Sequence, residues 1–306
     1  MALPTPEPAV DPLSDDVPDR DDGTGELRDV VVGTDGSDCA LGAVRWAARE
    51  AARRGVPLRI VHAAEYLGRQ NSAETPSPEL PTARRIAAKA YTIARQTAPG
   101  LDASTDVVAA DPATALLAAA AQGALIVLGS STTGAADELV FAPVALRVSA
   151  RSPRPVVVVP RLRGHTDATR PVVGVLGIGD PEDDEAVADF AAEVARHSAV
   201  GLSLIQTRAP RRGASPESED GSGAWQRRFP DLAVTTAALN GATRTQLLAA
   251  ASPAPLIVLS AGRDSTLHRS PDGAHRWLMR HCTSPMALVP PSGGRRHDGG
   301  GSTPSD

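Results

Sequence analysis

Two short polar segments, each directly after an apolar run, carry the residues of this chain best suited to hold a ligand. Thr34-Asp-Gly-Ser37 follows the run Val30 to Val32, and Gly129-Ser-Ser-Thr-Thr-Gly134 follows the run Leu125 to Leu128. Glycines let backbone amides approach an anion, and a carboxylate such as Asp35 can accept hydrogen bonds from a ribose. These residues suggest nucleotide binding, although Asp35 could equally cap the turn before the next helix.

Other polar residues support neither catalysis nor metal binding. His62 ends an expected strand and could line a nucleotide pocket, but a histidine there is more often a structural residue. His275 and His281 are six residues apart, on different faces of a helix, with no cysteine or carboxylate cluster beside them. No nucleophile, base and orienting acid can be assembled, and no Walker-type lysine follows the glycine loop. The chain is therefore predicted to be no enzyme and to bind no metal.

The elements that would position these segments alternate between strands and helices. In the first half, strands are expected at 30–33, 56–62, 105–109, 125–128 and 156–159, with helices at 40–53, 82–97 and 113–121. A further helix is expected between the small-residue loop that ends at Gly134 and the last strand. Ser37 or Asp38 is a good N-cap for the first helix, and Gly55 is a good stop. Short apolar runs of this kind are typical of strands buried on both faces of a parallel sheet. The pattern predicts an α/β fold.

The second half of the chain repeats the first. Leu125 corresponds to Leu256, and Gly129 to Ser260, at a constant offset of 131 residues. In this second copy Leu176 takes the place of Asp35, so its version of the site is degenerate. The expected organisation is a disordered acidic tail (1–28), a first domain (29–160), a linker (161–169), a second domain (170–290) and a disordered polar tail (291–306).

Composition narrows the class of protein. Hydrophobic residues make up 42% of the 306 residues but aromatic residues only 3%, so the core must be built mainly from Ala, Val and Leu. A net charge of -5 without a concentrated basic face argues against a nucleic-acid partner. Cys39 and Cys282 form no disulfide framework, and no apolar run approaches the roughly 20 residues needed to span a bilayer. We expect a soluble cytoplasmic protein without a membrane partner.

Four segments together resemble a universal stress protein domain: Val30 to Ser37, Asp111 to Ala113, Leu125 to Ser130 and Pro155 to Pro160. The resemblance covers about residues 29–160 and, more weakly, 170–290, as in a tandem member of that family. It implies two doubly wound, five-stranded parallel-sheet domains, each a flavodoxin-like three-layer sandwich that binds adenine nucleotides. It also implies that the two domains pair through their last strands, which would give an internal pseudo-dimer.

The resemblance further implies an ATP site in the first domain. Family members use an Asp after the first strand, which matches Asp35, and a motif G-x2-G-x9-G-[ST], whose first glycine matches Gly129. The remaining motif positions hold Thr132, Ala142 and Pro143, and Gly134 partly compensates for the missing glycine. The residues that the resemblance assigns to the nucleotide are Thr34, Asp35, His62, Gly129, Ser130, Gly134 and Val144.

The function expected from this resemblance is that of a stress-response regulator or scaffold with a weak ATP site and unidentified protein partners. One alternative is an ATP pyrophosphatase-like enzyme, but such enzymes carry a S-G-G-x-D-S loop that Gly33 to Ser37 does not match. Another alternative is a structural interaction module that binds no ligand. Whether the purified protein retains nucleotide separates these possibilities.

Overall fold

A computed structural model describes residues 29–65, 79–121, 123–130, 142–161, 169–178, 181–207, 221–261 and 274–291. The two expected tails fall almost entirely outside these ranges, as do residues 162–168 of the expected linker. Gly134 and the rest of the segment 131–141 also lie outside the described residues.

The first half alternates strands and helices in the order predicted from its apolar runs. Its elements are β1 (Val30–Gly33), α1 (Asp38–Arg54), β2 (Leu58–Ala63), α2 (Leu80–Thr97), β3 (Ala103–Val108), α3 (Pro112–Ala119), β4 (Leu125–Ser130), α4 (Ala142–Ser149) and β5 (Val156–Pro160). Helix α1 begins where the Ser37 side chain accepts a hydrogen bond from the Ala40 amide, and it ends at Gly55, whose φ of 66° is left-handed.

The described elements of the second half follow the same succession. Its elements are β6 (Val172–Leu176), α5 (Pro181–His197), β7 (Leu202–Gln206), α6 (Gly221–Arg228), β8 (Val234–Ala238), α7 (Arg244–Ala251), β9 (Ile257–Ser260), α9 (Ala274–His281) and β10 (Met286–Val289). The sequence predicts a loop at 211–223 and no helix at α6. Contacts of its side chains in the folded structure stabilise this short helix: Trp225 stacks on Phe229, and Gln226 donates to the Leu232 carbonyl at 2.9 Å.

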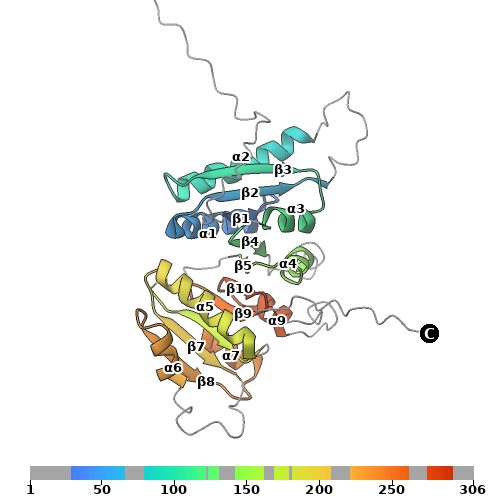
Figure 1. Ribbon diagram of the computed structural model, residues 1–306. Helices are drawn as coiled ribbons and strands as arrows, with labels where there is room; N and C mark the ends of the chain where they lie inside the picture. The colour runs from blue at the N-terminus through green and yellow to red at the C-terminus, as the bar shows by residue number, and fades with distance from the viewer. Residues whose placement is uncertain are drawn as a thin grey trace, which may run out of the picture.

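The described strands form one sheet in the order β3-β2-β1-β4-β5-β10-β9-β6-β7-β8 (Figure 1). Within each half the hydrogen-bonded neighbours are parallel, whereas β5 and β10 pair in antiparallel fashion, with Val157 opposite Ala287. The strand order on one side of this pair mirrors the order on the other. The predicted α/β fold with a mostly parallel sheet is confirmed.

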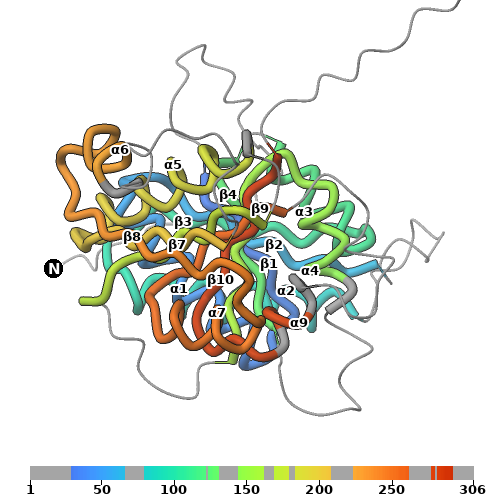
Figure 2. Tube along the Cα trace, turned by 90° about the horizontal axis from the view of Figure 1, so that it is seen from below, coloured from blue at the N-terminus to red at the C-terminus, as the bar shows by residue number. Residues whose placement is uncertain are grey.

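Helices cover both faces of the sheet. In the first half α1 and α2 cover one face and α3 and α4 the other (Figure 1). Figure 2 shows α5 and α6 on one side of β7 and β8, with α7 and α9 on the opposite side. The apolar cluster under α1 and α2 continues without a break under α5, so the core on this face spans both halves. Ala, Val and Leu supply most of its side chains, because small helices pack closely on valine-rich strands.

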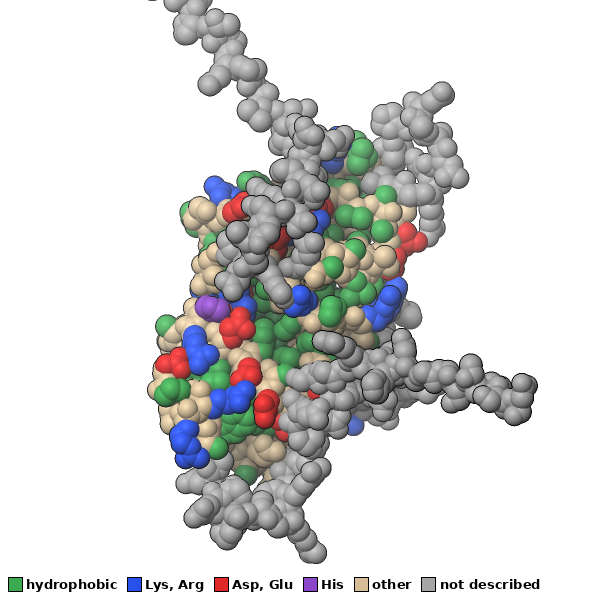
Figure 3. All heavy atoms as spheres, viewed as in Figure 1, with side chains coloured by type: hydrophobic (Ala, Val, Ile, Leu, Met, Phe, Trp, Pro, Cys, Tyr) green, Lys and Arg blue, Asp and Glu red, His purple; other side chains and the backbone are tan. Residues whose placement is uncertain are grey.

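Two further features are the distribution of charged side chains on the surface and the lengths of the helices. Acidic and basic side chains are interspersed over α5 and α6 on the face seen in Figure 3. One pair that joins these two helices is Arg228 with Asp189, at 2.8 Å. Among the described residues, no helix is long and apolar enough to cross a membrane.

Candidate functional site

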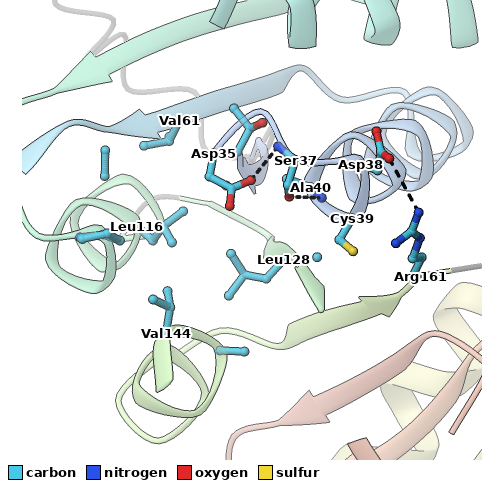
Figure 4. A pocket seen from close by; sticks show the side chains of 16 residues that line it. Asp35, Ser37, Asp38, Cys39, Ala40, Val61, Leu116, Leu128, Val144 and Arg161 are labelled. Carbon is cyan, nitrogen blue, oxygen red and sulfur yellow. Dashed lines mark hydrogen bonds and ion pairs between the residues drawn. The ribbon is translucent and has the colours of Figure 1, made fainter. Parts of the chain in front are cut away.

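A cavity of about 360 Å³ opens at the carboxyl ends of β1 and β4 (Figure 4). Parallel strands present their carboxyl ends at one edge of the sheet, and ligands of such folds bind there. The residues that line this cavity come from β1, β2 and β4, from the segments that follow β1 and β5, and from α1, α3 and α4: Gly33, Thr34, Asp35, Ser37, Asp38, Cys39, Ala40, Val61, Ala63, Pro112, Leu116, Leu128, Gly129, Val144, Ala145 and Arg161. Four of the seven residues assigned to the nucleotide from the sequence are among them.

The turn after β1 is built by side chains that bond to nearby backbone amides. The Gly36 amide donates to Thr34 Oγ1 at 3.2 Å, and the Ser37 amide donates to Asp35 Oδ1 at 2.9 Å. Gly36 has a φ of 83°, which favours glycine. Asp35 is exposed at the cavity and has no other hydrogen-bond partner among the described residues. Its carboxylate therefore caps the turn with one oxygen, and the other accepts no hydrogen bond from the described residues.

Gly129 lies where β4 meets the start of α1. A Cβ atom at this position would lie 2.6 Å from the carbonyl carbon and oxygen of Cys39 and 2.7 Å from the Ala40 amide nitrogen. Glycine is therefore required for the close packing of helix and strand, whether or not an anion binds. Gly129 thus has a packing role in addition to the role in anion binding that the sequence predicts.

Two residues assigned to the nucleotide from the sequence do not line the cavity. Val61 and Ala63 of β2 face it, so His62 between them points to the opposite face of the sheet. There the His62 side chain is 5% exposed, with Nδ1 2.8 Å from the Thr34 carbonyl oxygen. Ser130 is also absent from the lining; its carbonyl accepts a hydrogen bond from the Arg161 amide at 3.1 Å.

Arg161 and Asp38 belong to the cavity although the sequence argument did not assign them to it. Arg161 was placed in the linker, yet it is the first residue after β5, whose carboxyl end lies at the same edge as those of β1 and β4. Parallel strand order was the signal that could have located it. Arg161 Nη2 lies 3.7 Å from Asp38 Oδ2, and the two side chains are 51% and 82% exposed.

One wall of the cavity is fixed by an ion pair between α3 and α4. Asp111 caps α3 by accepting from the Thr114 amide at 3.1 Å, and Arg147 of α4 donates two hydrogen bonds of 3.0 Å to the same carboxylate. These bonds from Arg147 hold the pKa of the Asp111 carboxyl below its usual value. The pair joins the helix that carries Leu116 to the helix that carries Val144, so it positions the apolar part of the cavity.

The equivalent positions in the second half hold buried residues of different types. Leu176 stands where Asp35 stands in the first half and is 2% exposed. Ser260 replaces Gly129, and its hydroxyl donates to Asp183 Oδ2 at 3.1 Å, with both residues buried. Across the described ranges of both halves, no group of three or more His, Cys, Asp or Glu residues could hold a metal ion.

Residues 26–160 match the model of the Universal stress protein family. The first half of the chain is thus similar to a universal stress protein domain. A universal stress protein of Mycobacterium tuberculosis is 26% identical over 247 residues, which is 76% of this chain and 85% of that protein. A second one from the same organism is 25% identical over 218 residues, covering 69% of this chain and 78% of that protein.

Solved structures extend the likeness of fold beyond the family match. A universal stress protein from Archaeoglobus fulgidus superposes with a TM-score of 0.65 at 14% identity, covering 86% of this chain and 98% of that chain. A universal stress protein in complex with cAMP is 28% identical, with a TM-score of 0.35, and covers 44% of this chain.

Proposed function

We propose that this protein is a tandem universal stress protein that acts as a regulator or scaffold and binds an adenine nucleotide in its first half only. The observation that carries the proposal is the cavity at the carboxyl ends of β1 and β4. It collects Thr34, Asp35, Gly129 and Val144, residues that the family resemblance assigns to the nucleotide. Its volume of about 360 Å³ falls within the range of pockets that bind small molecules.

The chemistry of the lining suits a nucleoside. Leu116 and Val144 line one end of the cavity with apolar side chains that can pack against a base (Figure 4). The Asp35 carboxylate extends from the turn after β1 toward the same space and can accept hydrogen bonds from ribose hydroxyls (Figure 4). The second half lacks this combination, because Leu176 supplies no acceptor and the Ser260 hydroxyl is bonded to Asp183.

We also propose that the two halves act as an internal pseudo-dimer. The antiparallel pairing of β5 with β10 and the mirrored strand order support this arrangement. Hydrogen exchange followed by mass spectrometry should place both strands among the slowest-exchanging segments of the chain. Fast exchange throughout β10 would count against the pairing.

We propose no enzymatic activity, no nucleic-acid partner and a cytoplasmic location. Asp35 and Asp38 are the only carboxylates that line the cavity among the described residues, and no histidine in those ranges lines it. The sequence holds only two cysteines, Cys39 and Cys282, one in each half, which is no disulfide framework and suits a reducing compartment.

A second candidate, an interaction module that binds no ligand, is favoured by one observation. The Asp35 hydrogen bond to the Ser37 amide and the close packing at Gly129 both give these residues a structural role that needs no nucleotide. A binding experiment separates the two functions, because the first requires a ligand and the second forbids one.

Calorimetric titration of adenosine and AMP into the full chain tests the proposal. Asp35→Ala should weaken binding roughly tenfold to a hundredfold, since a hydrogen bond to a charged group contributes about 1.5–3 kcal/mol. Asp102→Ala, which removes an exposed carboxylate outside the cavity, should leave binding unchanged. Absence of binding to the wild-type protein, together with no nucleotide released by its denaturation, would favour the interaction module.

A further inference from the structure

The charges around the cavity are unequal. Among the described residues that line it, Asp35 and Asp38 are acidic and Arg161 is the one cation. Arg147 lies on the same helix as Val144, but both of its hydrogen bonds go to Asp111 at 3.0 Å. Within the described part of the chain, the guanidinium that can meet an anionic ligand in this cavity is therefore that of Arg161.

The contacts of Arg161 hold its backbone and leave its head group exchangeable. Its amide donates to the Ser130 carbonyl at 3.1 Å, which fixes the residue at the end of β5. Its Nη2 lies 3.7 Å from Asp38 Oδ2, longer than a hydrogen bond, and both side chains are largely exposed. An exposed pair of this kind is weak. A ligand oxyanion can therefore take the place of Asp38 at the guanidinium.

The lining residues are ordered along the cavity as the parts of a nucleotide are ordered. In Figure 4, Leu116 and Val144 lie at one end, Arg161 lies at the other, and Asp35 lies between them. A base at the apolar end and a ribose beside Asp35 would bring a 5′ phosphate toward Arg161. We propose that Arg161 is the phosphate-recognition residue of this cavity, and that the cavity prefers a nucleotide with one phosphate to a nucleoside triphosphate. This inference rests on the nucleotide site proposed above.

The preference for one phosphate follows from the balance of charge. One guanidinium can make two parallel hydrogen bonds to a single phosphate, and each further phosphate adds negative charge beside Asp35 and Asp38. Asp38 also occupies the first turn of α1, where it already compensates the positive end of the helix dipole.

Calorimetric titration of the full chain with adenosine, AMP and ATP in magnesium-free buffer tests this inference. The wild-type protein should bind AMP more tightly than either adenosine or ATP. Arg161→Gln should weaken AMP binding about tenfold, the loss of a charge-assisted contact, and leave adenosine binding unchanged. Arg151→Gln, an exposed arginine just after α4 that does not line the cavity, is the matched control and should change neither.

The outcomes separate this inference from the proposed function. Binding of adenosine and AMP with equal affinity, or ATP bound more tightly than AMP, would overturn the role of Arg161 while leaving the nucleotide site standing. Equal weakening of AMP and adenosine by Arg161→Gln would also overturn it, because the residue would then act on the whole cavity. Failure of the wild-type protein to bind any of the three ligands would refute the proposed nucleotide site itself, and this inference with it.

Discussion

Replacement of Arg54 tests how the two halves are joined on the face covered by α1 and α5. The Arg54 guanidinium lies between glutamates from different halves, with Nε 2.7 Å from Glu50 Oε1 and Nη1 2.5 Å from Glu193 Oε1. It also lies over the Phe190 ring, 5.7 Å from the centroid. The Glu50 side chain is 0% exposed and that of Arg54 only 6%. Arg54→Ala would leave the Glu50 carboxylate buried without its nearest cation.

The loss of stability expected for Arg54→Ala can be estimated from these contacts. Removal of one partner from a buried ion pair costs about 3–5 kcal/mol, because the remaining charge has neither water nor its partner. Loss of the contact with Phe190 adds about 0.5–1 kcal/mol. Arg53, with Nε 3.6 Å from Glu50 Oε2, retains part of the compensation. We therefore expect Arg54→Ala to lower the free energy of unfolding by about 3 kcal/mol.

Urea unfolding followed by circular dichroism measures this loss. Arg228→Ala is a matched control, because Arg228 also pairs with a carboxylate, Asp189, at 2.8 Å and lies over an aromatic ring, Phe229. Its pair is 41% and 51% exposed, so its removal should cost only about 0–1 kcal/mol. Equal losses in the two variants would refute the reasoning, since they would show that Glu50 is not a desolvated charge in the folded protein.

Two further predictions concern the walls of the cavity. Because the pKa of Asp111 is lower in the folded protein than in the unfolded chain, where it is about 3.9, the Asp111–Arg147 pair stabilises the fold above that pH. This stabilisation is lost as the pH falls through the pKa of Asp111 in the folded protein. Arg147→Gln should therefore lower the free energy of unfolding by less than about 1 kcal/mol at neutral pH and have no effect in acid. A difference in the free energy of unfolding between Arg147→Gln and the wild-type protein that persists at the lowest pH would contradict this account. Gly129→Ala should lower the free energy of unfolding in urea by about 1–3 kcal/mol without any ligand, because its Cβ would lie 2.6 Å from the Cys39 backbone. Gly42→Ala is the control and should not destabilise the protein, because a Cβ at position 42 would meet nothing within 4 Å. An unchanged unfolding midpoint in Gly129→Ala would mean that the helix yields without cost.

The fold could be predicted because its signals are local. Runs such as Val30 to Val32 are bounded by turn residues, and the helix between Ser37 and Gly55 has a cap at each end. Asp35 and Gly129 could be placed at one edge of the sheet because parallel strands end together. The repeat offset located the corresponding positions in the second half.

The rest of the site depends on geometry that short motifs do not contain. The sequence places His62 at the pocket, but side chains alternate between the two faces of the sheet along β2, and Val61 and Ala63 occupy the face toward the pocket. Arg161 was assigned to a linker because charge and lack of periodicity dominate the segment that follows it. Helix α6 was missed because its glycine-rich start has low helix propensity, and the stacking of Trp225 on Phe229 outweighs that preference.

The second half has the elements that complete the sheet but lacks the counterparts of Asp35 and Gly129 on which the proposed ligand site depends. Ser260 has a side chain where Gly129 has none, and its hydroxyl bonds to the buried carboxylate of Asp183, so this position is satisfied within the protein. In contrast, Val156, Val157 and Val158 of β5 are each at most 3% exposed, and β10 pairs with all three. Without β10 these valines would form an apolar edge strand with unpaired amides and carbonyls, which invites aggregation. Covering that edge is a physical reason for the second half to persist that does not require a second ligand site.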